Sequence, residues 1–299
     1  MEQSTYQFNW EIEMTNLSNT EERKKLEKII IDEIDNWCVQ KYEEGHRKHL
    51  GASIIGEACS RKLWYTFRWV KAQSLSGRMH RLFQDGHNAE HLFIEYLKGI
   101  GFQVFERDES GNQFHISGCN GHYGGSLDGW GYMPERYGYS KKILFEFKTN
   151  GTGIGFSNVA KNGVIKEKPK HYAQMCQYGY KHAIEYAVYL IKNKNDSDII
   201  LKIVPLDWNY GKFLEKKAED IIISKTPPNK ISENPSYFDC KYCDFQTICH
   251  DNEHVEKNCR SCKFAEPAPE KQWYCSRYNS NIPDEFIKTG CDGHLSINK

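Results

Sequence analysis

The sequence predicts an α/β fold with a central mixed sheet flanked by helices. Segments with helical and strand periodicity follow one another in the order helices, strands, helix, strands, helix, and no internal repeat breaks that order. Such an order is typical of one sheet covered by helices. The chain has 299 residues, which is long enough for one large core and a small appendage.

Three helices are expected before the first strand. Residues 1–18 form a polar leader, and Asn19 or Thr20 can cap a helix that has one apolar face. Further helices are expected over residues 57–70 and 78–98, again from the spacing of apolar residues. The apolar face of the first helix contains Leu26, Ile29, Ile30, Ile34, Trp37 and Cys38. The inward side chains of the third are Leu82, Phe83, Ala89, Phe93 and Leu97.

Strands follow, because short aromatic and β-branched segments alternate with Gly, Asn and Pro. A helix is expected at 170–183 before the last two strands and another at 210–224 after them. The expected strands are FQVFER, QFHIS, GSLDGWGYM, KILFEFKT, YAVYLIK and IILKIVPL.

Composition limits the class of protein. Lys+Arg and Asp+Glu are both 40, so a basic surface for nucleic acid must be local. The sequence has no apolar run of about 18 residues, which a membrane span needs, and its N-terminus lacks the pattern of a signal peptide. A cytoplasmic location is therefore expected. In a reducing compartment, clustered cysteines bind metal more often than they form disulfides.

One stretch combines two carboxylates with an amine. Glu146 and Lys148 are two residues apart on an expected strand and share a face, while Phe145 and Phe147 point into the core. Asp128, on a neighbouring strand, can lie beside Glu146. Such oxygen ligands suit Mg²⁺ or Mn²⁺. The alternative is an ordinary sheet surface, but the glycines that precede Asp128 favour a site, because they clear space for a ligand.

The pattern Asp128…Glu146-Phe147-Lys148 resembles the core signature of the PD-(D/E)XK nuclease superfamily. More narrowly, it is similar to RecB/AddB-type domains, CRISPR-associated RecB-like exonucleases and phage λ-exonuclease-like nucleases. The resemblance covers roughly residues 50–250 and implies a restriction-endonuclease-like core that hydrolyses DNA with divalent ions. Asp128, Glu146 and the Phe147 carbonyl would bind metal, and Lys148 would activate water.

The resemblance extends to two helices. λ-exonuclease-like members have Glu four residues after a glycine, where RecB-like members have His, and Glu90 lies at that offset from Gly86. Glu90 would be a third metal ligand, although His87 and His91 leave the assignment open, as does a solvated helix face. Gln174 and Tyr178 resemble the family's Gln-x-x-x-Tyr motif and would position the phosphate or the strand, unless they only pack a helix.

Cysteines form two sets. Cys240, Cys243 and Cys249, with Cys59 early in the chain, resemble the one-early, three-late arrangement that holds a [4Fe–4S] cluster in iron–sulfur RecB-type nucleases. A zinc site is the alternative, because spacing does not name the metal, and so is no metal at all. Closing this loop of about 180 residues would restrict the unfolded chain.

The second set of cysteines predicts a Zn²⁺ site in a lobe of residues 255–299, because so short a segment usually needs a cross-link such as a structural metal ion. Three histidines are spare ligands, and three other cysteines are expected to be buried thiols. Basic side chains of the lobe could extend a DNA-binding face or contact a partner. The second set is Cys259, Cys262, Cys275 and Cys291. The spare ligands are His250, His254 and His294, the buried thiols Cys38, Cys119 and Cys176, and the basic residues Lys257, Arg260, Lys263 and Arg277.

The expected organisation is a helical leader at 1–50, a nuclease core with its iron–sulfur clamp at 51–254, and the cysteine-rich lobe at 255–299. The resemblance implies a DNA exonuclease, and Glu90 favours a role in phage or mobile-element recombination. One alternative is a nuclease that trims spacers beside a CRISPR-adaptation partner. Another is a catalytically silent DNA-binding protein in recombination.

Overall fold

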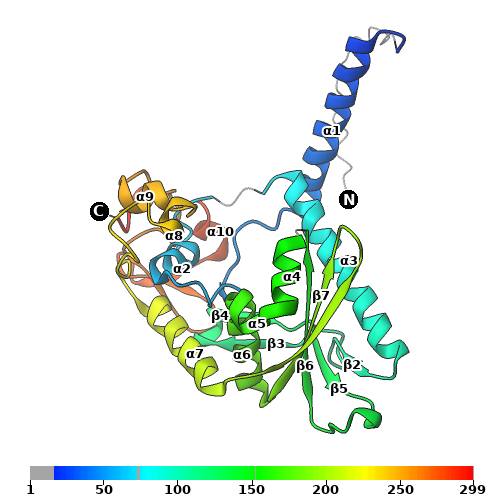
Figure 1. Ribbon diagram of the computed structural model, residues 1–299. Helices are drawn as coiled ribbons and strands as arrows, with labels where there is room; N and C mark the ends of the chain where they lie inside the picture. The colour runs from blue at the N-terminus through cyan, green and yellow to red at the C-terminus, as the bar shows by residue number, and fades with distance from the viewer. Residues whose placement is uncertain (1–16, 73–74, 152, 299) are drawn as a thin grey trace. The chain divides into compact units, whose positions relative to one another are not determined.

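The computed structural model of the protein describes residues 17–72, 75–151 and 153–298 (Figure 1). The leader, core and lobe expected from the sequence remain predictions of domain organisation, and residues 1–16 lie outside the described residues. In the described ranges, no helix is both long and apolar enough to cross a membrane.

The smaller of two compact units consists of residues 17–44 and 75–84. Its helix α1 (Thr20–Tyr42) begins at Asn19, whose side chain accepts hydrogen bonds from two backbone N–H groups of the first turn. Within the described residues, the predicted apolar face is buried only at Cys38. The exposed members of that face are Ile29, Ile30, Ile34 and Trp37.

The larger unit, residues 45–72 and 85–298, is built on a five-stranded sheet with the order β2-β5-β6-β7-β8. β6 and β7 run parallel and the other neighbouring pairs are antiparallel, so the predicted mixed sheet is confirmed. A parallel pair needs a crossover, which three helices supply between these two strands. The strands are β2 (Gln103–Phe105), β5 (Gly129–Tyr132), β6 (Ile143–Asn150), β7 (Tyr186–Asn193) and β8 (Ile199–Pro205).

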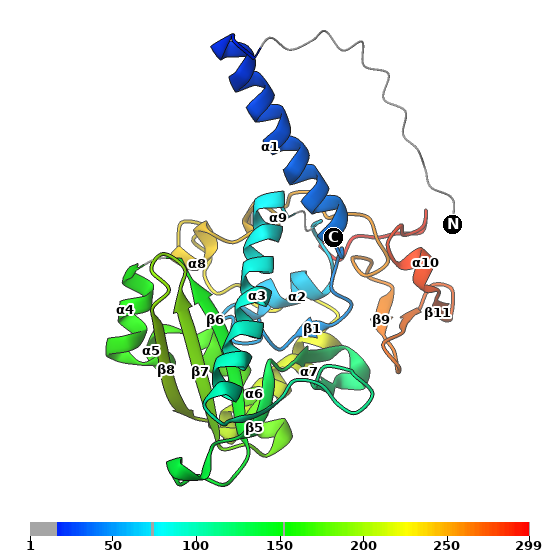
Figure 2. The same ribbon diagram turned by 90° about the vertical axis from the view of Figure 1, so that its right-hand side faces the viewer.

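Helices cover both faces of this sheet (Figure 2). α3 packs on one face, where Phe93 and Leu97 share an apolar cluster with Phe145 and Phe147 of β6. α2, α6 and α7 contribute to a second cluster on the other face, which includes Tyr189 of β7. The helices are α2 (Ser60–Phe67), α3 (Gly77–Gly99), α4 (Gly153–Asn162), α5 (Val164–Glu167), α6 (Pro169–His182) and α7 (Trp208–Ile223).

The helices predicted around 57–70, 78–98, 170–183 and 210–224 correspond to α2, α3, α6 and α7. In α3, Ala89, Phe93 and Leu97 are buried as predicted. Leu82 and Phe83 are exposed instead, because they belong to the part of α3 that lies in the smaller unit.

The predicted strand GSLDGWGYM is two strands in two different sheets. Its first part is β4 (Tyr123–Ser126), the middle strand of a small sheet with the order β1-β4-β3. Its second part is β5 of the main sheet, and Leu127 and Asp128 link the two. Asp128 therefore lies where the chain passes from one sheet to the other. The remaining strands of the small sheet are β1 (Leu50–Gly51) and β3 (His115–Gly118), and a 3-10 turn, Cys119–Gly121, follows β3.

The C-terminal region forms a third, antiparallel sheet with the order β11-β10-β9. Two short helices that carry late cysteines precede it, and a further short helix follows it. These elements are α8 (Phe238–Lys241), α9 (Gln246–His250), β9 (Ala265–Pro267), β10 (Trp273–Cys275), β11 (Ser280–Ile282) and α10 (Asp284–Ile287).

Candidate active site

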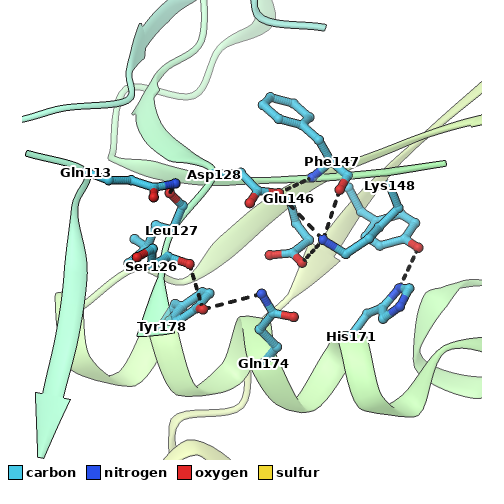
Figure 3. Close-up of polar contacts among 11 residues, drawn as sticks. Gln113, Ser126, Leu127, Asp128, Glu146, Phe147, Lys148, His171, Gln174 and Tyr178 are labelled. Atoms are coloured by element: carbon cyan, nitrogen blue, oxygen red, sulfur yellow. Dashed lines mark hydrogen bonds and ion pairs between the residues drawn. The ribbon is translucent and has the colours of Figure 1, made fainter. Parts of the chain in front are cut away.

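β6 presents the acidic and basic groups of the candidate site from the centre of the main sheet. Its pleat directs Phe145 and Phe147 toward α3, where the rings of Phe93 and Phe147 lie 5.5 Å apart. Glu146 and Lys148 consequently project toward α6 on the opposite face (Figure 3). Two aromatic anchors on one face thus fix the direction of both polar side chains on the other.

Asp128 reaches the same point from the link between β4 and β5. The β5–β6 ladder stops at Phe145, so the amide of Phe147 has no partner on β5. Asp128 takes that position instead, because the Phe147 N–H donates to Asp128 Oδ2 at 2.7 Å. This hydrogen bond holds the Asp128 carboxylate against the strand that carries Glu146.

α6 holds the link in place from below. The Tyr178 hydroxyl donates to the carbonyl oxygen of Ser126 at 2.8 Å, and Gln174 Nε2 donates to Tyr178 Oη at 3.4 Å (Figure 3). Gly125 allows this approach, because a Cβ there would lie 2.7 Å from Tyr178 Oη. Tyr178 is only 1% exposed, so in this structure it positions the link rather than reaching a bound strand.

The Lys148 ammonium lies among the oxygens for which the sequence predicted a metal ion. Lys148 Nζ is 2.5 Å from Glu146 Oε1, 2.9 Å from the Phe147 carbonyl oxygen and 3.6 Å from Asp128 Oδ2 (Figure 3). Glu146 Oε2 is buried and has no hydrogen-bond partner among the described residues. The ammonium therefore takes the place of a cation in an oxygen-lined position that still has acceptor capacity.

Glu90 comes to this cluster from α3. Its pKa is raised to about 7 by burial and by the neighbouring charge of Asp128, while Lys148 and His91 oppose the rise. Burial raises the pKa of Glu146 to about 8, with Asp128 and Glu90 adding to the effect and Lys148 opposing it. His87 and His91 are exposed.

Carboxylates outnumber cations at this point. The charges of Asp128 and Glu146 raise the pKa of Lys148 against the effect of its burial, so the amine stays protonated. One ammonium cannot neutralise three carboxylates, and a divalent cation would relieve the surplus. In the described part of the chain, no group of three or more His, Cys, Asp or Glu side chains has the arrangement of a metal site as it stands.

His171 is a neighbour of the site that the sequence did not single out. Its Nδ1 shares a hydrogen bond of 2.9 Å with the hydroxyl of Tyr189, which pairs with Glu146 across the β6–β7 ladder. Burial, followed by the charges of Lys148 and Lys168, lowers the pKa of His171 to about 3. The sequence contains a signal for His171, because this residue precedes Gln174 by three positions and therefore shares its helix face.

The first cysteine set lines one small cavity. Cys59 reaches it from the N-terminal end of α2, and Cys240, Cys243 and Cys249 reach it from α8, α9 and the turn between them. Burial raises the pKa of Cys240, and the charges of Cys59 and Cys249 raise it further. The fold therefore brings together the early cysteine and the three late ones.

The other cysteines and the basic residues of the C-terminal region lie in different surroundings. The second set lines another small cavity, together with His294. Cys38 and Cys176 are buried as predicted, but Cys119 is only half-buried, because it lies in the surface turn after β3. Arg260 was predicted to extend a DNA-binding face, which is wrong, because its side chain packs among aromatic rings with 1% exposure.

No family model matches the chain, and no curated protein is a significant match. Solved structures similar to it include the alkaline exonuclease LHK-Exo from Laribacter hongkongensis, at 16% identity and a TM-score of 0.42 over 59% of this chain and 87% of that one. LHK-Exo in complex with dAMP gives 17% identity and a TM-score of 0.42 over 58% and 86%. SSO0001 gives 15% identity and a TM-score of 0.42 over 76% and 99%. At these values the likeness carries no argument about activity.

Proposed function

We propose that the chain is a divalent-metal-dependent deoxyribonuclease that hydrolyses phosphodiester bonds, acting as an exonuclease on DNA ends. One observation carries the proposal: the carboxylates of Asp128 and Glu146 and the carbonyl of Phe147 surround a single cationic position on β6. Glu90 adds a third carboxylate close enough to act on the other two. Oxygen-only surroundings with several carboxylates suit Mg²⁺ or Mn²⁺.

The metal would be held by Glu90, Asp128, Glu146 and the Phe147 carbonyl. When bound, such an ion polarises a phosphodiester and lowers the pKa of a coordinated water. Lys148 must then leave the position its ammonium takes, and its long side chain can swing outward while staying near the carboxylates. Because Lys148 stays protonated, it suits the donation of a hydrogen bond to water or to a phosphate oxygen as negative charge develops.

Tyr178 and Gln174 contribute by holding the link that carries Asp128. Their hydrogen bonds join α6 to the carbonyl of Ser126, two residues before Asp128. A displacement of about 1 Å in a reacting group can cost about a hundredfold in rate. We therefore assign both to positioning, with Gln174, at 6% exposure, the closer of the two to the surface.

The first cysteine set would hold a [4Fe–4S] cluster with a structural role. Support comes from the convergence of Cys59 with the three late cysteines on one cavity. Thiolates bind such clusters through four cysteines. We expect anaerobically purified protein to be brown, and Cys59→Ser or Cys240→Ser to bleach it and lower the folded yield. Colourless protein with stoichiometric zinc at this site would overturn the cluster in favour of zinc.

The substrate and context follow from the same site. A complete set of Asp128, Glu146 and Lys148 disfavours a catalytically silent DNA-binding protein. Glu90 on α3 matches the residue type of the λ-exonuclease-like pattern at this position, where RecB-like members have His. It therefore favours DNA processing in phage or mobile-element recombination over spacer trimming. A recombination protein would then be the expected partner besides DNA.

The deciding experiment combines purified protein with Mn²⁺ and end-labelled single- and double-stranded DNA. We expect nucleotides to be released from ends, while a covalently closed circle stays intact. Cutting of the circle would replace the exonuclease by an endonuclease. Lys166→Ala, an exposed lysine on α5, is the matched control for Lys148→Ala. Absence of cleavage of every DNA by folded, metal-loaded protein would overturn the proposed function.

A further inference from the structure

The antiparallel C-terminal sheet brings four cysteines to one end. Cys259 and Cys262 form a turn immediately before β9, in which the Cys262 N–H donates to the Cys259 carbonyl at 3.1 Å. Cys275 ends β10 and pairs with Ala265, the first residue of β9, so it lies beside that turn. Cys291 arrives after α10, whose Ile287 carbonyl accepts a hydrogen bond from the Cys259 N–H at 2.9 Å.

The four cysteines lie together around one cavity. A backbone N–H, that of Leu295, already points at Cys262 Sγ at 3.5 Å, as amides do toward metal-bound thiolates.

Two buried arginines beside these cysteines supply the second observation. Arg260, between Cys259 and Cys262, is 1% exposed, and Arg68, which follows α2, is 2% exposed. Arg260 donates to the carbonyls of Lys48 and Phe67, and Arg68 donates to those of Cys262 and Ala265 at 2.7 and 2.9 Å.

Neither guanidinium forms an ion pair with a carboxylate in the described part of the chain, and the Nε atoms of both are buried without a partner there. Both guanidinium groups contact an aromatic ring instead. The Cζ atom of Arg260 lies 4.6 Å from the centre of the Trp273 ring, and that of Arg68 lies 5.2 Å from it. Glu266, the acid close enough to act on Arg68, is itself paired with Lys225 at 2.8 Å. Two unpaired buried cations are costly unless negative charge lies nearby.

We propose that the four cysteines of the C-terminal sheet hold one Zn²⁺ ion as thiolates, and that the surplus negative charge of this centre is balanced by Arg68 and Arg260. Four thiolates carry two more negative charges than the ion carries positive ones. The two guanidinium groups match that surplus in number. Zinc binding would also fix the Cys262 and Ala265 carbonyls that hold Arg68, and so tie the sheet to the end of α2.

His294 is the competing ligand, since it lines the same cavity. Its Nε2 already shares a hydrogen bond of 3.1 Å with the Ser261 hydroxyl. A centre with three cysteines and His294 would carry one surplus negative charge and would leave one of the two arginines without balance. The charge count therefore favours Cys291 as the fourth ligand.

Metal analysis of the full-length protein tests the zinc site without reference to nuclease activity. We expect one zinc per chain, lost in Cys262→Ser and Cys275→Ser and kept in the control Cys119→Ser, a half-buried cysteine outside both sets. Wild-type protein, titrated with a mercurial in the presence of a zinc indicator, should release that zinc, so a variant that fails to fold does not decide the result. Zinc-free wild-type protein, or zinc retained in folded Cys262→Ser, would overturn the site.

A separate experiment tests whether the arginines balance the charge of the zinc centre. Arg260→Met should weaken zinc binding by about 10- to 100-fold in competition with a chelator, as loss of an outer partner does. Arg260→Lys keeps the charge and should lie closer to the wild type. Lys257→Met, at an exposed lysine paired with Asp292, is the control that should bind zinc unchanged. Equal zinc affinity of Arg260→Met and the wild type would overturn the charge balance while leaving the ligand set.

Discussion

Replacement of Gly125 by alanine should displace the segment that positions Asp128 in the candidate site. A Cβ at this residue would lie 2.7 Å from Tyr178 Oη and 2.8 Å from the Cβ of Ala52, whereas ordinary contact begins at 3.4 Å. Gly125→Ala must therefore open the second contact by about 0.6 Å. Overpacking of this kind costs about 1–3 kcal/mol of folding free energy. Because Asp128 follows three residues later, the shift is transmitted to the carboxylate.

The variant should also lose activity under conditions in which it stays folded, because the displacement reaches the reacting groups. A displacement of about 1 Å can cost a hundredfold, so about half that distance predicts a loss of about tenfold in kcat/KM. The assay is release of nucleotides from end-labelled DNA with Mn²⁺, well below the melting temperature of each variant. Gly99→Ala, at a helix position with open space around it, is the matched control.

A second variant separates the hydroxyl contact from general damage. Tyr178→Phe removes Oη, so the double variant Gly125→Ala/Tyr178→Phe should be more active than Gly125→Ala, although the contact with Ala52 remains. Tyr178→Phe by itself should be only modestly impaired, since it loses the hydrogen bonds to the Ser126 carbonyl and from Gln174, each worth about 0.5–1.5 kcal/mol. Wild-type activity and melting temperature in Gly125→Ala would refute the close approach.

Other predictions concern the site's charges. Lys148→Ala and Asp128→Ala should each abolish cleavage while the protein still folds, as its melting curve would show, and full activity in either would contradict the assignment. Glu90→Gln should weaken Mn²⁺ binding, measured by calorimetry, far more than His91→Gln; the reverse order would place the ligand on His91. The raised pKa values of Glu90 and Glu146, about 7 and 8, mean that the metal-free protein should lose stability as pH rises from about 5 to 8. Mn²⁺-dependent cleavage should rise over the same range, because the metal needs both carboxylates deprotonated; a flat melting temperature would show that neither pKa is shifted.

Periodicity predicted the main helices and central strands well because their burial is repetitive. Phe93 and Leu97 recur at helical spacing on α3, and β6 carries alternating core residues toward them. The first helix was predicted correctly, but most of its apolar face is exposed. Its spacing marks an apolar face, but spacing does not tell whether the chain has anything to cover it, and Trp37 is exposed.

The split of the strand around Asp128 could not be predicted from alternation. Residues 125–133 read as one strand because glycine fits either sheet and Leu127 continues the apolar pattern. The break depends on partners remote in sequence: Gly124 pairs with Gly51 of β1, and Gly129 pairs with Phe145 of β6. The change of sheet places Asp128 where its carboxylate accepts a hydrogen bond from the Phe147 N–H of β6. The motif alone does not predict this contact.

Spacing indicates which face a residue shares but not how deep it lies. Gln174 and Tyr178 were placed together correctly on α6, yet the tyrosine is buried and holds the link instead of facing a strand. Arg260 shows the same difference, because a basic residue in a cysteine turn could face solvent or the core. The packing of Phe67, Trp69 and Trp273 around it decides for the core.

Total charge conceals the most informative feature of the molecule. Lys+Arg and Asp+Glu balance at 40 each, yet charge is unbalanced at two points inside the fold. Around Lys148, three carboxyl groups meet one ammonium, and beside the C-terminal sheet two guanidinium groups form no ion pair with a carboxylate among the described residues. A folded protein tolerates such imbalances where a charge of the other sign compensates or where a group changes its protonation state, because burial of unpaired charge is costly. The first point calls for a cation and the second for anions, so Mn²⁺ should raise the melting temperature more in wild-type protein than in Asp128→Asn, whereas zinc removal should lower it equally in both.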